Sequence, residues 1–205
     1  MSGPRRSVRE ELREVRARYI LDVAQEVLLE SGYRDAAMDE IAARVGIAKG
    51  TLYQHFPRKE DLILALFERH VARFVDVVQG AADAELPPRA KLEQILRYVH
   101  QDQHGAYAML QLLTHNTELR RSLASHKVQA LRCMERTWAQ VERILEDGKS
   151  DGSFDPSLST GLMMSAFTNA LTIGWRQPRL VEEALSREQL AAQVCRVLFE
   201  GIVSP

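Results

Sequence analysis

The chain has 205 residues, of which 45% are hydrophobic and 27% are charged, and its formal net charge at pH 7 is −1. This composition is typical of folded soluble domains and excludes a largely disordered chain. The two cysteines, Cys133 and Cys195, are far apart in the sequence, which excludes a disulfide scaffold, a zinc finger and a CxxC redox pair.

The N-terminal segment, residues 1–18, carries six arginines and three glutamates and has no apolar stretch of the kind found in secretion signals. We therefore expect no signal peptide and a cytoplasmic location. The arginines can form a basic arm that follows a phosphate backbone. A solvated helix with internal salt bridges is an equally weighted alternative for this segment.

Apolar residues recur at three- and four-residue steps along nearly the whole chain, so we expect an all-α fold of about nine helices. The first helix should end near Gly32 and bury one apolar stripe, formed by Leu12, Val15, Tyr19, Ile20, Val23, Ala24, Val27 and Leu28. Pro57 should end the third helix. The later helices are expected at residues 38–45, 49–55, 59–79, 89–103, 105–114, 117–147, 157–176 and 187–202.

Residues 38–56, MDEIAARVGIAKGTLYQHF, predict a helix-turn-helix. Gly46 can take the left-handed conformation that the turn needs, and the small Ala42 lets the second helix approach closely. The apolar contacts between the helices should come from Ile41, Val45, Ile47, Leu52 and Phe56. The exposed side of the second helix then presents its first residues to base edges, namely Lys49, Gly50 and Thr51, with Gln54 one turn later.

The longer stretch 32–67, GYRDAAMDEIAARVGIAKGTLYQHFPRKEDLILALF, resembles the DNA-binding region of the TetR family of bacterial transcriptional regulators. The resemblance is densest over residues 46–62. It implies that Tyr53 and His55 touch the phosphate backbone or neighbouring bases, and that Lys59 grips a phosphate at the start of the fourth helix. Helix N-terminal N–H groups beside a cation also form an anion site on physical grounds. The alternatives are a packing aromatic for Tyr53 and a cap or core residue for His55.

Two positions depart from the family pattern, which often has a hydroxyl residue where this chain has Ala37 and Ala48. Each lost helix cap costs about 1 kcal/mol. Asp35 or Asp39 can compensate in part at the second helix. The departures weaken the expected phosphate contacts at Ala37 and Ala48 but not the expected fold.

The uncharged segment 156–175 has the length of a membrane span, but seven of its side chains carry hydroxyl or amide groups, so we expect a helix buried in protein instead. Small residues recur on one side of it, and the last helix adds an apolar stripe. We expect a two-fold dimer through these two helices, as the family layout also implies; the central helix of a monomeric bundle is the alternative. The expected interface residues are Gly161, Ser165, Asn169, Val194 and Leu198.

The resemblance also implies an effector pocket inside the C-terminal bundle. The candidate lining residues are large or soft side chains that simple core packing would also explain: Phe74, Tyr107, Met109, Leu112, Trp138, Met163, Phe167 and Trp175. Their character favours a small apolar or aromatic effector. His100 and His104 have metal-ligand spacing, but no carboxylate or cysteine motif accompanies them, so we expect neither a bound metal nor a cofactor.

The sequence as a whole predicts a regulator rather than an enzyme, because it contains no nucleotide, metalloprotease or nucleophile motif. We assign residues 1–75 to a DNA-binding domain and residues 76–205 to a ligand-binding and dimerisation domain. The expected function is a homodimeric repressor that leaves a palindromic DNA operator when a small effector binds. The alternatives are an architectural DNA-binding dimer without a ligand and an all-α metal-dependent enzyme.

Overall fold

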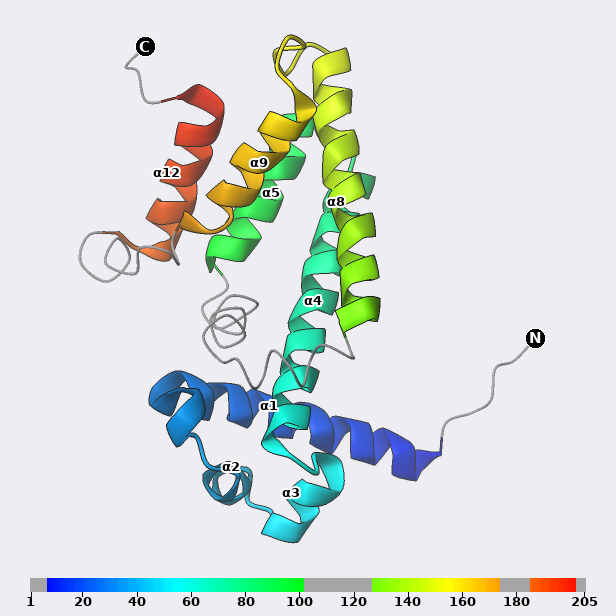
Figure 1. Cartoon of the computed structure of the whole chain (residues 1–205), viewed down its shortest axis with the longest axis vertical. Coiled ribbons are helices and arrows are strands. Elements are labelled where there is room, and N and C mark those ends of the chain that lie inside the picture. The colour runs from blue at the N-terminus through cyan, green and yellow to red at the C-terminus, as the bar shows by residue number, and fades with distance from the viewer. Residues whose placement is uncertain (1–6, 102–126, 174–184, 202–205) are drawn as a thin grey trace. The chain divides into compact units, whose positions relative to one another are not determined.

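The computed structural model describes residues 7–101, 127–173 and 185–201, and every regular element in these ranges is a helix (Figure 1). The helices are α1 (Val8–Asp35), α2 (Met38–Val45), α3 (Lys49–His55), α4 (Lys59–Asp83), α5 (Pro88–Gln101), α8 (Lys127–Ser150), α9 (Thr160–Ala170) and α12 (Arg187–Glu200). The predicted all-α fold is confirmed. The predicted helix 105–114 and the start of the predicted helix 117–147 lie outside the described residues.

Helix α1 begins at a capping box. The Ser7 hydroxyl accepts a hydrogen bond from the Glu10 backbone N–H at 3.2 Å, and the Glu10 carboxylate accepts one from the Ser7 N–H at 2.9 Å. Near its other end, Gly32 has φ 73° and ψ 172°, which interrupts the helical backbone. The helix end expected at Gly32 is therefore a kink, after which helical structure resumes as far as Asp35.

The apolar stripe predicted for α1 is buried only in its later part, because its burial begins after Tyr19. Residues from Ile20 onward belong to the core of the first unit, whereas Leu12, Val15 and Tyr19 are more than half exposed. The reason is that the core formed with α2, α3 and α4 reaches only as far as Ala17, which packs against its edge. The first third of α1 projects beyond that core.

Contacts divide the chain into two units at a point inside α4, with His70 the last α4 residue of the first unit and Val71 the first of the second. The core of the first unit holds Ile41, Leu52 and Leu62 at 1% exposure or less. In that unit, Arg69 of α4 ties down α1 by pairing with Asp22 at 2.6 Å.

The core of the second unit lies among α5, α8, α9, α12 and the later part of α4. Its fully buried side chains include Val78 of α4, Leu92 and Ile95 of α5, and Phe167 of α9. Phe74 and Trp138 pack as a tilted ring pair with centroids 5.7 Å apart. Each α4 half therefore contributes to a different core.

Helix α9 is shorter than the predicted helix 157–176 and less buried. It starts at Thr160 because the Asp155 carboxylate accepts hydrogen bonds from the Ser157 N–H and hydroxyl, at 2.8 and 2.7 Å, which holds a turn before it. Only Phe167 and Ala170 of α9 are buried. The single chain therefore leaves most of this helix uncovered, and its predicted burial against a second copy stays a prediction.

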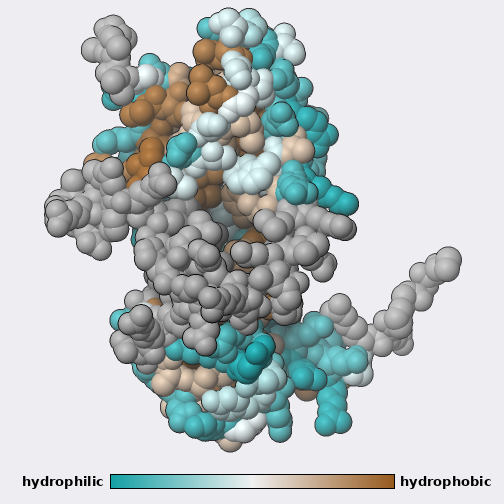
Figure 2. All heavy atoms as spheres, in the orientation of Figure 1, coloured by the Kyte–Doolittle hydropathy of each residue, from teal (hydrophilic) through white to brown (hydrophobic). Residues whose placement is uncertain are grey.

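Exposed apolar residues remain on α9 and α12. Leu162 is 62% exposed and Val197 is 50% exposed, and Figure 2 shows hydrophobic side chains gathered over this part of the second unit. In the described ranges, no helix combines the length and the apolar character that crossing a membrane requires.

Candidate nucleic-acid interface

The turn between α2 and α3 has the geometry that the sequence predicted. Gly46 ends α2 with φ 76° and ψ 32°, in the left-handed region, and its N–H bonds back to the carbonyls of Ala42 and Ala43. The next N–H, that of Ile47, also donates to the Ala42 carbonyl, at 3.0 Å. These bonds satisfy the free carbonyls at the end of α2. The glycine is needed here because a side chain would be strained at this φ.

The predicted apolar contacts fix the angle between the two short helices. Ile41, Leu52 and Phe56 are buried, and Val45 and Ile47 pack against them as partly buried side chains. Phe56 leaves the helical region at φ −132°, as expected for the residue before a proline.

The opposite side of α3 faces solvent and carries the predicted DNA-contacting residues. Lys49, Gly50, Tyr53 and Gln54 are exposed, and Thr51 is half-buried. An added Cβ at Gly50 would meet no atom within 4 Å, so the backbone there is open to close approach. The structure thus brings the first turn of α3 and Gln54 to one accessible surface.

Lys49 is engaged within the chain. Its ammonium lies 2.7 Å from a carboxylate oxygen of Asp39 on α2 and 6.0 Å from the centre of the Tyr53 ring. The hydrogen bond from Lys49 to Asp39 raises the pKa of Lys49 above its ordinary value, and the charge attraction adds to it. The sequence does not predict this pairing, because the position of Asp39 near a helix start suggests a cap instead.

The exposed part of α1 reaches the C-terminal end of α3. The Arg13 guanidinium donates a hydrogen bond to the Gln54 backbone carbonyl at 3.3 Å. Burial lowers the pKa of the half-buried His55 below its ordinary value, and the charges of Arg13 and Arg16 lower it further. At neutral pH, His55 is therefore a neutral donor beside two arginines.

The helix starts of this unit differ in how they are capped. Neither Ala37 nor Ala48 makes a side-chain cap, as the sequence predicted, and Asp39 does not substitute because it binds Lys49. At α4, the Asp61 carboxylate accepts the Arg58 backbone N–H at 3.0 Å. The half-buried Lys59 follows directly, with Glu60 and Asp61 in the same turn of α4. Their two carboxylates would compete with a DNA phosphate for the positive end of the helix.

The predicted effector-pocket residues fall into three groups. Tyr107, Met109, Leu112 and Trp175 lie outside the described residues. Phe74 and Phe167 are buried in the core of the second unit, and Trp138 and Met163 pack against it. These four positions form a continuous apolar interior.

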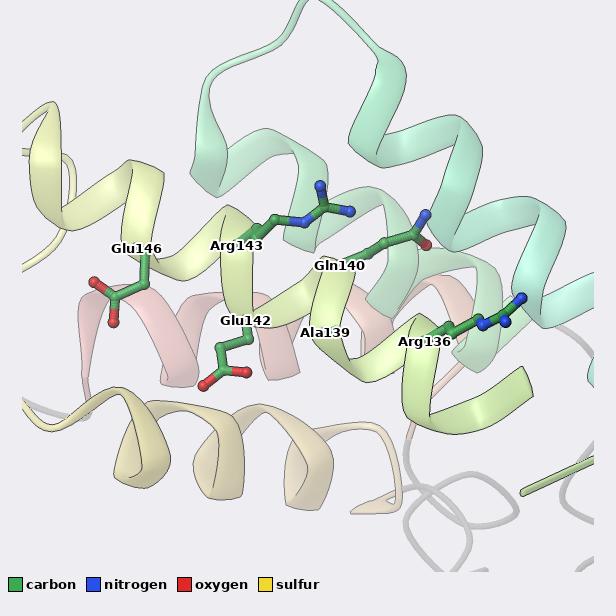
Figure 3. A pocket seen from close by; sticks show the side chains of 6 residues that line it. All are labelled: Arg136, Ala139, Gln140, Glu142, Arg143 and Glu146. Atoms are coloured by element: carbon green, nitrogen blue, oxygen red, sulfur yellow. The ribbon is translucent and has the colours of Figure 1, made fainter. Parts of the chain in front are cut away.

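A surface hollow of about 620 Å³ runs along α8 and involves none of the predicted residues (Figure 3). It is lined by six side chains of that helix: Arg136, Ala139, Gln140, Glu142, Arg143 and Glu146. Charged groups of both signs line this shallow site, so it does not match the apolar effector expected from the sequence.

The predicted interface residues on α9 and α12 are only partly accessible. Gly161, Ser165 and Asn169 of α9 are exposed, whereas Leu198 of α12 is half-buried and Val194 is buried. The α9 residues fold their polar atoms inward along the helix. Ser165 donates to the Gly161 carbonyl at 2.9 Å, and Asn169 donates to the Ser165 carbonyl at 2.8 Å. Their exposed surface is therefore less polar than the residue names suggest.

His100 is a core residue in this structure. It is 1% exposed, and because a carbonyl can only accept, its Nε2–H donates to the Ala170 carbonyl at 3.0 Å. Among the described residues, no group of three histidine, cysteine or acidic side chains is placed to hold a metal ion. His104 lies outside those residues.

The chain is similar to known bacterial regulators. The sequence profile "Bacterial regulatory proteins, tetR family" matches residues 20–66. The HTH-type transcriptional activator FasR of Mycolicibacterium smegmatis is 39% identical over 97 residues, which are 45% of this chain and 44% of FasR. The fatty acid metabolism regulator protein of Bacillus subtilis is 30% identical over 42% of this chain and 45% of its own length. The matched region thus spans less than half of these two relatives. The HTH-type transcriptional regulator UidR of Escherichia coli is 28% identical over 90% of this chain and 91% of UidR.

Solved structures share the fold over nearly the whole chain. The TetR family transcriptional regulator PfmR from Thermus thermophilus has a TM-score of 0.70 at 21% identity, covering 90% of this chain and 99% of PfmR. FadR from Bacillus subtilis, solved with stearoyl-CoA, has a TM-score of 0.62 at 22% identity, covering 91% and 99%. AibR, solved with isovaleryl coenzyme A and operator DNA, has a TM-score of 0.65 at 22% identity, covering 90% and 98%. These structures show the fold, and the profile match identifies residues 20–66, which include α2 and α3, as the helix-turn-helix region typical of the tetR family of bacterial regulatory proteins.

Proposed function

We propose that the chain is a cytoplasmic DNA-binding transcriptional regulator and not an enzyme. The observation that carries the proposal is the accessible side of α3, where Lys49, Gly50, Tyr53 and Gln54 are exposed above a buried core. A helix with this exposure in a helix-turn-helix enters the major groove, where its first residues meet base edges. The residues proposed to contact DNA are Lys49, Gly50, Thr51, Tyr53, Gln54, His55 and Lys59.

The N-terminal part of α1 extends the same surface. Arg13 binds the end of α3 through the Gln54 carbonyl, and Arg16 is close enough to affect the pKa of His55. Two arginines beside the recognition helix suit phosphate contact. This placement favours the basic-arm hypothesis over a purely solvated helix.

The regulator acts as a homodimer that reads a palindromic operator. The exposed residues Gly161, Leu162, Ser165 and Val197 support this assembly, because they leave an uncovered surface of small and apolar side chains on α9 and α12. Small residues allow a second helix to approach closely, and covering them removes apolar surface from water. A two-fold dimer presents two copies of α3 to successive major grooves.

The effector is an acyl-CoA thioester, and the regulator is a repressor released by it. Two structures with this fold carry acyl-CoA compounds in their names, stearoyl-CoA and isovaleryl coenzyme A. An acyl chain also matches the apolar side chains of Phe74, Trp138 and Met163 in the second unit. The alternative is an architectural DNA-binding dimer without a ligand. A failure of acyl-CoA compounds to release the DNA would support it.

The function is tested by selecting DNA. Purified wild-type protein is mixed with fragments of the source genome, and the retained fragments are sequenced. We expect recurrent fragments that contain one inverted repeat. The double variant Lys49→Ala, Tyr53→Ala should retain no recurrent fragment while keeping the wild-type thermal unfolding temperature, because both side chains are exposed. Retention without any shared sequence would contradict operator recognition.

Effector release is tested on the selected fragment. Stearoyl-CoA and isovaleryl-CoA are added separately to the DNA complex, with free coenzyme A as the control. At least one acyl-CoA should dissociate the complex, and free coenzyme A should not. Dissociation by all three compounds alike would contradict recognition of the acyl chain.

A further inference from the structure

The N-terminal part of α1 also carries an apolar stripe, distinct from the arginines that we propose contact phosphate. Val8, Leu12, Val15 and Tyr19 are 72%, 64%, 55% and 52% exposed, respectively. Their spacings of four, three and four residues place all four side chains along one line of the helix. The family profile begins at residue 20, so this stripe lies entirely before the matched region.

The stripe has a defined beginning and a defined end. The Ser7 capping box starts the helix one residue before Val8. The next position in the same register after Tyr19 is Asp22, which pairs with Arg69 of α4 at 2.6 Å. The stripe therefore stops where α4 is tied to α1, and its apolar part comprises residues 8–19.

The spacing is that of a coiled-coil seam two heptads long, with Val8 and Val15 at d positions and Leu12 and Tyr19 at a positions. The flanking positions are then Arg9 and Arg16 at e, and Glu11 and Arg18 at g. In a parallel pair, a g residue faces the e residue five positions later in the other helix, so Glu11 of each copy faces Arg16 of the other. In an antiparallel pair, Glu11 and Arg18 at g positions attract, but Arg9 and Arg16 at e positions face each other and repel, so only the parallel pair gains attraction without an opposing repulsion.

We propose that residues 8–19 bind the same segment of a second copy of this chain as a short parallel coiled coil. The occupant is a second copy because an apolar seam matches an identical seam, and because Glu11 and Arg16 are complementary in charge in the parallel register. The buried residues Ile20 and Ala24 lie on a different side of α1. Arg13, which contacts α3, also lies off the seam, so the rest of the first unit does not block the partner helix.

The helix is formed before the partner arrives. An isolated helix of this length is marginal in water. Here the segment continues into the folded part of α1 and has a capping box at its start, so pairing requires little further ordering. Four apolar side chains per copy give weak, concentration-dependent association. It becomes stronger wherever two copies are held close together, for example on adjacent DNA sites; that consequence rests on the proposed function, whereas the pairing does not.

Cysteine cross-linking without DNA tests the proposal on the full chain. Leu12→Cys places thiols at facing a positions of a parallel pair, and Glu14→Cys places them on the outer side as the matched control. Under mild oxidation, Leu12→Cys should form a covalent dimer on a non-reducing gel, while Glu14→Cys and the wild-type chain should not. Equal cross-linking by the two variants, or none by Leu12→Cys, would overturn the proposal. A disulfide formed only in a mixture of Leu12→Cys and Val15→Cys would overturn the parallel pairing.

A charge exchange gives an independent readout by analytical ultracentrifugation. Arg16→Glu should weaken the concentration-dependent association by about two- to fivefold, because it places a second carboxylate opposite Glu11 of the partner. The double variant Glu11→Arg, Arg16→Glu should restore it. Because no DNA is present, failure here leaves the DNA-binding proposal intact. Leu12→Glu, which places a charge at an a position, should also weaken association. Equal association constants for wild type, Arg16→Glu and Leu12→Glu would contradict the proposed coiled coil.

Discussion

Among single residues, Lys49, which we propose contacts DNA, is already held by another side chain of this chain. Asp39 accepts its hydrogen bond at 2.8 Å, and the pairing raises the pKa of Lys49, so the ammonium stays charged. The pair is exposed, and exposed pairs contribute little to stability. We therefore propose that Asp39 positions Lys49 and offsets its attraction to phosphate.

Asp39→Asn should strengthen binding to every DNA sequence and make the slope of log K against log salt steeper by about one unit, because one more net positive charge faces the phosphates. Glu40→Gln is the matched control, since Glu40 pairs with Arg44 at 2.7 Å and not with Lys49. Binding isotherms at several salt concentrations measure both variants. Equal slopes for Asp39→Asn and wild type would contradict the offset.

Thr51 and Lys59 should have different effects on DNA binding. Lys59→Ala should weaken binding to all sequences by a similar factor and reduce the salt slope by about one unit, since one phosphate contact is lost. Thr51→Ala should change which operator is preferred, because Thr51 lies in the first turn of α3. Selection of random DNA, together with salt titrations, distinguishes the two. A shift in sequence preference for Lys59→Ala would contradict its assignment to phosphate.

The burial of His100 leads to a prediction of how the free energy of unfolding depends on pH. Burial lowers its pKa below the ordinary value, partly offset by the Ala170 hydrogen bond, and the charge of Arg187 lowers it further. The unfolded chain therefore binds this proton at a higher pH than the folded chain. The free energy of unfolding should decrease as pH falls below the unfolded pKa of about 6.5, with His100 contributing at most about 1.4 kcal/mol per pH unit. His55, whose pKa is also lowered, adds a contribution of the same sign.

His100→Gln should reduce this slope, because glutamine has no proton to gain in the unfolded state. Urea unfolding at pH values from about 5 to about 8 measures the slope for the variant and for wild type. A steeper loss of stability at low pH in His100→Gln than in wild type would contradict the assignment.

At the scale of elements, the sequence predicted best where one local pattern determines the structure. The bounds of α2 and α3 agree with the prediction because Gly46 and Pro57 end helices for reasons contained in their own backbones. The burial of α1 and α9 could not be predicted from periodicity. An apolar side chain on a helix shows that a partner surface is favoured, but not whether that surface belongs to the same chain.

A substitution on helix α9 tests whether the chain forms the proposed dimer. Ser165→Glu places a charge on the exposed small-residue surface, where a partner helix would bury it at a cost of several kcal/mol. Sedimentation should show monomer, and operator affinity should decrease strongly because the second half-site no longer contributes. Ser150→Glu is the matched control, since it makes the same substitution at an exposed position at the end of α8, outside the proposed interface. A dimeric Ser165→Glu protein with full operator affinity would place the interface elsewhere.

Helix α4 links the two units through the chain itself. Its early residues Leu62 and Leu66 belong to the core of the first unit, while Phe74 and Val78 belong to that of the second. At 1.5 Å per residue, a helix of 25 residues spans about 37 Å. We therefore expect a ligand that repacks the residues around Phe74 to act on the same helix that carries Leu62 in the core of the first unit.

Across the whole molecule, the sequence predicted the exposed surface of α3 more fully than it predicted where an effector could bind. Residues such as Lys49 and Tyr53 are close in sequence, and one turn places them on one surface. The side chains that could line an effector site come from several helices, and Trp138 and Phe167 serve core packing equally well. Ion pairs such as Asp39–Lys49 also depend on the angle between helices, which residue type alone does not determine.

The most direct test of a ligand-responsive regulator measures how an acyl-CoA changes the affinity for operator DNA, and how operator DNA changes the affinity for the acyl-CoA. Operator affinity is measured with and without stearoyl-CoA, and stearoyl-CoA affinity is measured with and without operator, with isovaleryl-CoA as a second probe. We predict that one acyl-CoA lowers operator affinity by about 5- to 150-fold, and that operator DNA lowers the affinity for that acyl-CoA by the same factor. Operator affinity that stays unchanged at high concentrations of both compounds would contradict it.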